Sequence, residues 1–164
     1  MKKLAIVFCA FLFGVSVHAQ EGINLGFNFG LPMADASDVT SFTVGLDANY
    51  LWSVTEAVDV GVATGFTNTF GKNYQVGPIR IEGEDIQFIP LAAAGRYHFS
   101  DKFRAGVDLG YAIGLNDGND GGFYYRPMVG FGVNSAVELN LSYTGVSLDG
   151  FNFATLTMGL MFNF

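Results

Sequence analysis

The sequence predicts an all-β protein, an eight-stranded antiparallel up-and-down transmembrane β-barrel, and three observations lead to this fold class. Half of the 164 residues are hydrophobic, yet only 14% are charged. Beyond residue 17 the apolar side chains occupy alternate positions, which is the period of a β-strand. Glycine and phenylalanine are abundant, with 22 and 17 residues. Such a chain is too apolar to be intrinsically disordered.

The amino-terminal segment has the pattern of a secretory signal peptide. Lys2 and Lys3 precede an apolar stretch over residues 4–17, and a cleavage point follows between Ala19 and Gln20. The stretch is short for a membrane-spanning helix, which needs about 20 apolar residues. We therefore expect residues 1–19 to be a cleaved signal peptide and residues 20–164 to form one barrel domain. An uncleaved membrane anchor is the alternative.

The first three strands are expected at residues 23–31, 42–50 and 58–66. In the first of them, every second residue is large and apolar: Ile23, Leu25, Phe27, Phe29 and Leu31. The residues between these positions are asparagine or glycine. One face of each strand is therefore apolar, and the other is small or polar.

Five further strands are expected at residues 86–99, 103–115, 123–133, 137–144 and 155–164. Pro90 and Pro127 lie inside the first and third of these segments. Because proline has no amide hydrogen to donate, we expect each to mark a bulge or a loosened strand end. No segment of the sequence carries a sustained helical period.

The connections between the predicted strands alternate in length. The odd-numbered connections are long and rich in glycine, aspartate and asparagine; they cover residues 32–41, 67–85, 116–122 and 145–152. The even-numbered connections, at residues 52–57, 100–102 and 134–136, are shorter. In an up-and-down barrel this alternation gathers the long loops at one end and the short turns at the other.

An eight-stranded antiparallel chain is compatible with a soluble lipocalin-like barrel or with a transmembrane barrel. The interior of such a barrel is just wide enough for side chains to fill it, so a glycine-rich face fits inside. The leucine, valine, isoleucine and phenylalanine side chains then face outward, toward lipid. Aromatic residues also fall near both ends of the strands, where interfacial girdles form. The pattern therefore favours the transmembrane barrel.

Strand parity directs a group of charged residues into the lumen. These are Asp47, Asp59, Arg96, Arg104, Asp108, Arg126 and Glu138. Charges in a dry interior must be paired, so we expect a structural salt-bridge network that plugs the barrel. Arg104 and Asp108 share one strand, and the two flanking strands carry Arg96 and Arg126. A gated ion path is the alternative.

Several function classes are not expected. A net charge of −7 with only eight lysine and arginine residues gives no basic surface for nucleic acid. Cys9 lies in the signal segment, and His98 is the remaining histidine of the predicted mature chain, so no nucleophile with an adjacent base is apparent. The loop at residues 116–121 is similar to a calcium loop but lacks the closing glutamate. We therefore expect no enzyme activity, cofactor or metal.

The last strand ends in alternating large residues, Leu160, Phe162 and Phe164. Together with the signal peptide and eight alternating strands, it makes the chain resemble the small bacterial outer-membrane β-barrel domain family, the OmpA/OmpX-like barrels. The resemblance implies residence in the lipid of a Gram-negative cell outer membrane, with the short turns toward the periplasm. It also implies that the terminal strand is recognised by periplasmic chaperones and the barrel-assembly machinery.

We expect a monomeric outer-membrane barrel with a plugged polar lumen, long acidic loops outside and a structural or surface-interaction role. One alternative is a ligand-binding or adhesive module that meets an unknown extracellular ligand through loop 67–85. This loop carries Lys72, Tyr74 and Arg80 in addition to its acidic residues. A less favoured alternative is a lipid-modifying outer-membrane enzyme.

Overall fold

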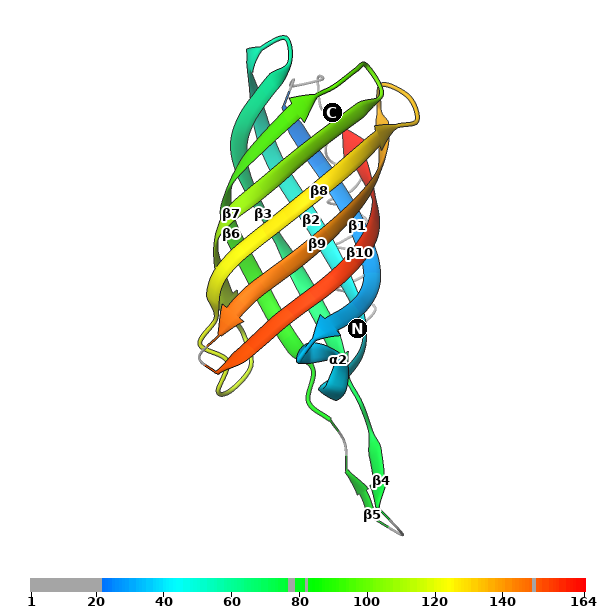
Figure 1. Cartoon of the computed structure of the whole chain (residues 1–164), viewed down its shortest axis with the longest axis vertical. Coiled ribbons are helices and arrows are strands. Elements are labelled where there is room, and N and C mark those ends of the chain that lie inside the picture. The colour runs from blue at the N-terminus through cyan, green and yellow to red at the C-terminus, as the bar shows by residue number, and fades with distance from the viewer. Residues whose placement is uncertain (1–21, 77–78, 82, 149) are drawn as a thin grey trace, which may run out of the picture.

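The computed structural model describes residues 22–76, 79–81, 83–148 and 150–164. The predicted signal peptide and its cleavage point at Ala19 and Gln20 lie outside these residues. Within the described part of the chain, eight strands close into an antiparallel barrel, which confirms the predicted fold class (Figure 1). That same part of the chain contains no helix with the length and hydropathy needed to cross a membrane.

The barrel strands follow one another in an up-and-down order. They are β1 (Ile23–Ala34), β2 (Thr40–Thr55), β3 (Val58–Gly71), β6 (Ile86–His98), β7 (Phe103–Gly114), β8 (Gly122–Gly132), β9 (Val137–Leu148) and β10 (Phe151–Asn163). Each pairs with its neighbours in the chain, and β1 pairs with β10 to close the barrel. Closure leaves no unpaired sheet edge, which is the condition for a sheet to cross hydrocarbon.

The two ends of the barrel differ. Residues 56–57, 99–102 and 133–136 make the turns at one end, which we call the short-turn end. The opposite end, which we call the loop end, carries the short helix α2 (Ala36–Val39) and the hairpin of β4 (Tyr74–Val76) and β5 (Ile79–Ile81). Figure 1 shows this hairpin projecting well beyond the barrel, on the same end as α2.

Several strands run further than predicted. β2 continues to Thr55 through most of the predicted connection 52–57. β9 and β10 occupy most of the predicted loop 145–152, so the expectation of a long fourth loop is wrong. Their pairing continues to the Leu148–Phe151 pair because Val146 and Phe153 keep the alternating pattern. Gly150, with φ of 76°, then lets the chain reverse tightly.

Pro90 and Pro127 neither bulge nor end their strands, so that prediction is wrong. Both prolines pair with residues of β7 without a break. On the other side, pairing with β3 stops at Pro90 and pairing with β9 stops at Pro127, and each resumes in the same register. The missing amide hydrogen therefore leaves a one-sided gap in the ladder. Beside Pro90, the Thr64 hydroxyl donates to the proline carbonyl at 2.8 Å.

The outer face of the barrel is apolar, as the alternation predicts. Phe29, Leu46 and Leu91 expose 57%, 53% and 55% of their surface. Aromatic rings lie near the ends of the strands. At the short-turn end Tyr50 stands edge-on to Trp52, with ring centroids 4.9 Å apart. This band of exposed side chains fits a surface that faces lipid.

Candidate functional site: the lumen and the loop-end cavity

The middle of the lumen is crossed by an ion pair. Arg126 of β8 binds the Asp47 carboxylate of β2 through two hydrogen bonds of 2.8 and 2.9 Å. Both side chains are nearly buried, at 7% and 11% exposure. Arg126 Nε also donates to the Ser142 hydroxyl at 3.0 Å, and Asn28 donates to Asp47 at 2.8 Å. Because β9, β10 and β1 separate β8 from β2, this contact spans the barrel interior.

Two further arginines make ion pairs between nearby strands. Arg96 donates to Asp108 at 2.6 Å, and both side chains are buried. Arg104 contacts Glu138, which is also buried. The sequence placed Asp108 among three arginines without choosing between them, and the structure assigns it to Arg96.

Glycines make room for these long side chains. A Cβ atom at Gly106 would collide with the Arg96 side chain, and one at Gly130 would lie 2.5 Å from the Glu138 carboxyl carbon. Arg104 stands opposite Gly130 in the β7–β8 register, so Arg104 and Glu138 meet across the bare backbone of β8. The glycines of the inner face therefore determine which charges can approach one another.

The remaining predicted lumen charge, Asp59, lies near the short-turn end. It is 2.6 Å from Nε2 of His98 and accepts a hydrogen bond of 2.7 Å from the Ser53 hydroxyl. Ser53 donates to the carboxylate rather than to the imidazole. This grouping therefore lacks the contact between hydroxyl and imidazole that activates a serine nucleophile.

Sequence reasoning missed an apolar cluster inside the lumen, on the loop side of the Asp47–Arg126 pair. The cluster consists of Ala36, Phe88, Ala112, Tyr124, Val146 and Phe153. The rings of Phe88 and Phe153 lie 4.9 Å apart. Phe88 shares the inward parity of Arg96, so counting along β6 could have found it. Phe153 was harder to place because the sequence suggested a loop just before it.

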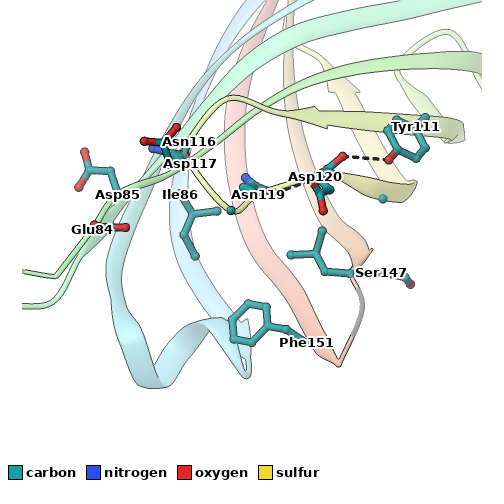
Figure 2. Close-up of a pocket in the computed structure, with 14 residues that line it drawn as sticks. Glu84, Asp85, Ile86, Tyr111, Asn116, Asp117, Asn119, Asp120, Ser147 and Phe151 are labelled. Carbon is teal, nitrogen blue, oxygen red and sulfur yellow. Dashed lines mark hydrogen bonds between the residues drawn. The ribbon is translucent and has the colours of Figure 1, made fainter.

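A cavity of about 670 Å³ opens at the loop end (Figure 2). Its walls come from the segment before β6, the loop between β7 and β8, and the ends of β9 and β10. Glu84, Asp117 and Asp120 supply carboxylates, while Ile86 and Phe151 supply apolar surface. Figure 2 shows Phe151 below the loop that carries the two aspartates. The cavity therefore combines negative charge with an apolar wall.

Hydrogen bonds hold the loop that forms this cavity. Asn116 accepts from the Gln87 amide at 2.7 Å, and Asn119 donates to the Gln87 carbonyl at 3.1 Å. The Tyr111 hydroxyl donates to the Asp120 carbonyl at 3.0 Å. Among the described residues, no group of three or more histidine, cysteine, aspartate or glutamate side chains is arranged to hold a metal ion.

Residues 5–164 match the family described as the outer membrane protein beta-barrel domain. The chain belongs to this family. No curated protein matches it. Membership agrees with the closed barrel and the apolar outer face, and it identifies the chain as an outer-membrane barrel protein.

Several barrels of known structure are similar to this chain in fold, at low sequence identity. The attachment invasion locus protein Ail of Yersinia pestis is 16% identical, with a TM-score of 0.60 over 88% of this chain and all of that one. The amino-terminal barrel domain of OprF from Pseudomonas aeruginosa is 15% identical, with a TM-score of 0.53 over 88% of this chain and 98% of that one. A de novo designed transmembrane barrel is 11% identical, with a TM-score of 0.54 over 87% and 94% of the two chains. These likenesses concern the fold.

The terminal residues predicted to carry the assembly signal lie on β10 and just after it. Leu160 pairs with Phe27 of β1, and the rings of Phe27 and Phe162 are 6.4 Å apart. The Phe164 amide donates to the Ile23 carbonyl at 3.0 Å. The end of the chain therefore forms part of the seam that closes the barrel. Its recognition by the assembly machinery stays a prediction.

Proposed function

We propose that the protein is a non-conducting barrel of the Gram-negative outer membrane that displays its loop end outside the cell as an interaction surface. The observation that carries this proposal is the Asp47–Arg126 pair across the middle of the lumen. On one side of it lies the Arg96–Asp108 pair, and on the loop side lies the apolar cluster. An eight-stranded interior filled in this way has no room for a row of hydrated ions.

The orientation rests on the difference between the two ends. The carboxylates of Glu84, Asp117 and Asp120 and the projecting hairpin all belong to the loop end. Transmembrane barrels of bacteria keep short turns toward the periplasm and longer loops outside. We further propose that the barrel is a monomer in outer-membrane lipid and that Leu160, Phe162 and Phe164 form the signal for its assembly machinery.

The proposal predicts that the folded barrel does not conduct ions. In a planar lipid bilayer with potassium chloride on both sides, we expect no step in current above the leak of the lipid alone. A porin added to the same bilayer serves as the positive control, because its wide lumen is filled with water. A large and steady conductance from the purified barrel would show an open lumen and would contradict the proposal.

A ligand-binding role through loop 67–85 is the second candidate, and the loop-end cavity favours it. Glu84 at the end of this loop lines the cavity together with Asp117 and Asp120. Among the described residues, these three carboxylates make no hydrogen bond or ion pair. A ligand that suits such a cavity carries a cationic group on an apolar body, as a lysine-rich and leucine-rich peptide does.

This candidate predicts that such a peptide binds the folded barrel through Glu84 of loop 67–85 and through Asp117 and Asp120 of the loop between β7 and β8. The triple variant Glu84→Gln/Asp117→Asn/Asp120→Asn should weaken binding by roughly fivefold or more, the effect of losing three exposed charge pairs. Isothermal titration calorimetry in detergent measures the affinity. Asp101→Asn, on an exposed turn at the short-turn end, is the matched control. Equal weakening by both variants would indicate general attraction to an acidic protein and would contradict a site in the cavity.

A further inference from the structure

The two halves of the lumen differ in how well their buried polar groups are satisfied. On the loop side, Thr43 and Thr69 bond to each other at 2.9 Å, and Thr40 donates to the Ala36 carbonyl at 2.6 Å. Nearer the short-turn end, both amide atoms of Asn140 are buried without a hydrogen-bond partner. Oε1 of Glu138, in the same half, is buried and unpartnered as well.

The space around Asn140 is shaped by glycine. In the strand registers, Asn140 stands between Gly130 of β8 and Gly159 of β10. Neither neighbour contributes a side chain, so the amide of Asn140 lies beside bare backbone. Asn140 is nevertheless only 2% exposed. A buried amide with no protein partner is costly unless water satisfies it.

A polar cavity lies at the short-turn end, next to Glu138. It measures about 170 Å³ and is lined by Arg104, Glu138 and Asn163, among others. A water molecule takes about 30 Å³ in the liquid and needs two to four polar partners when buried, so the cavity can hold several waters. Asn140 lies two residues beyond Glu138 on the same face of β9, a step of roughly 7 Å along the strand.

We propose that the short-turn half of the lumen is a blind chamber that binds a chain of water molecules. The chain enters at the cavity beside Arg104 and Glu138 and ends at the Asn140 amide. The Asp47–Arg126 pair and the apolar cluster block it from the loop end. The ligand is neutral water rather than an ion, because Arg104 and Glu138 already balance each other's charge. The proposed function requires only that the lumen is closed to ions. The chamber adds that one half of the interior is accessible to solvent from the short-turn end.

Cysteine reactivity tests the chamber. In a Cys9→Ser background, the chain carries no other cysteine. Asn140→Cys reports on the chamber, Thr69→Cys reports on the loop side of the lumen, and Ser135→Cys on an exposed turn is the positive control. Each variant is folded in detergent, checked by heat-modifiable migration and treated with methyl methanethiosulfonate, a small and neutral thiol reagent.

We expect Asn140→Cys to react within about tenfold of the exposed control and Thr69→Cys about 100-fold or more below it, because a sealed site reacts only after local opening. If Asn140→Cys is as slow as Thr69→Cys, the chamber is overturned while the closed lumen stands. If both react as fast as the exposed control, the lumen is open throughout and the proposed function fails as well.

A measurement on the unaltered protein keeps the test independent of how well the variants fold. Nuclear magnetic resonance detects magnetisation transfer from water to individual side-chain protons. We expect transfer to the Asn140 amide protons and none to the Thr43 and Thr69 hydroxyl protons. A resolved Asn140 amide without transfer from water would overturn the chamber.

Discussion

Arg126→Met is expected to destabilise the folded barrel by about 3–5 kcal/mol, because it leaves the Asp47 carboxylate buried without its partner. Arg126 supplies two hydrogen bonds to Asp47 and one to Ser142. Methionine has an unbranched apolar side chain that is shorter than arginine and replaces none of these bonds. Asn28 still donates to Asp47, yet a single neutral amide does not balance a buried charge.

Urea-induced unfolding in phospholipid vesicles measures this change as a shift in the transition midpoint. The double variant Asp47→Leu/Arg126→Met should recover much of the loss, because it removes both charges together. Lys102→Met, on an exposed turn, is the matched control and should change stability by at most about 0.5 kcal/mol. If Arg126→Met behaves like this control, the pair does not hold the lumen together.

Leu46→Arg is expected to cost about 2–4 kcal/mol, because it places a charge on the lipid-facing surface near mid-membrane. Leu46 lies in the middle of β2 with more than half of its surface exposed. Its register partners Phe27 and Phe66 are also exposed, so the surroundings of the new charge are apolar. The arginine would have to reach past these side chains to find a headgroup or water.

Val54→Arg is the matched control for this substitution. Val54 faces outward on the same strand but lies near the short-turn end, where an arginine costs only about 0–1 kcal/mol. Unfolding in vesicles of the same lipid compares the two variants. Equal midpoints would mean that the depth in the membrane makes no difference, which would contradict the assignment of this face to lipid.

The alternation of side chains predicted most of the barrel because it has a simple physical cause. Each strand has one lipid-facing side and one interior side, so every second residue meets the same environment. Phe29 and Leu46 could be assigned to the outer face from parity alone. The inward direction of Arg96 and Arg126 followed from the same count.

Which charges meet depends on information that parity does not contain. The Asp47–Arg126 pair joins β2 to β8, and only closure of the barrel through β1 and β10 brings those strands to face each other. The Arg104–Glu138 pair depends on the register of two strands against Gly130 between them. These contacts join residues far apart in the chain. The sequence could therefore identify the charged residues of the lumen but not which of them form ion pairs.

The alternation of side chains also did not predict where the strands end. Glycine, aspartate and asparagine at residues 145–152 suggested a loop, yet the pairing of β9 and β10 continues through most of it. The inward contact of Phe153 with Phe88 stabilises that extension. Propensity for turns was outweighed there by burial of an aromatic ring.

Arg96 lies across from Gly106, and this arrangement restricts which substitutions the two positions can accept during evolution. Because a Cβ at position 106 and a long side chain at position 96 need the same volume, neither can change freely while the other is kept. An alanine at 106 would meet both the Arg96 side chain and the Gly95 carbonyl oxygen, so it needs a shorter residue at 96 as well as a shift of the backbone, and Asp108 would then lose its partner. Substitutions at positions 96, 106 and 108 therefore depend on one another, and the order in which they can occur is constrained.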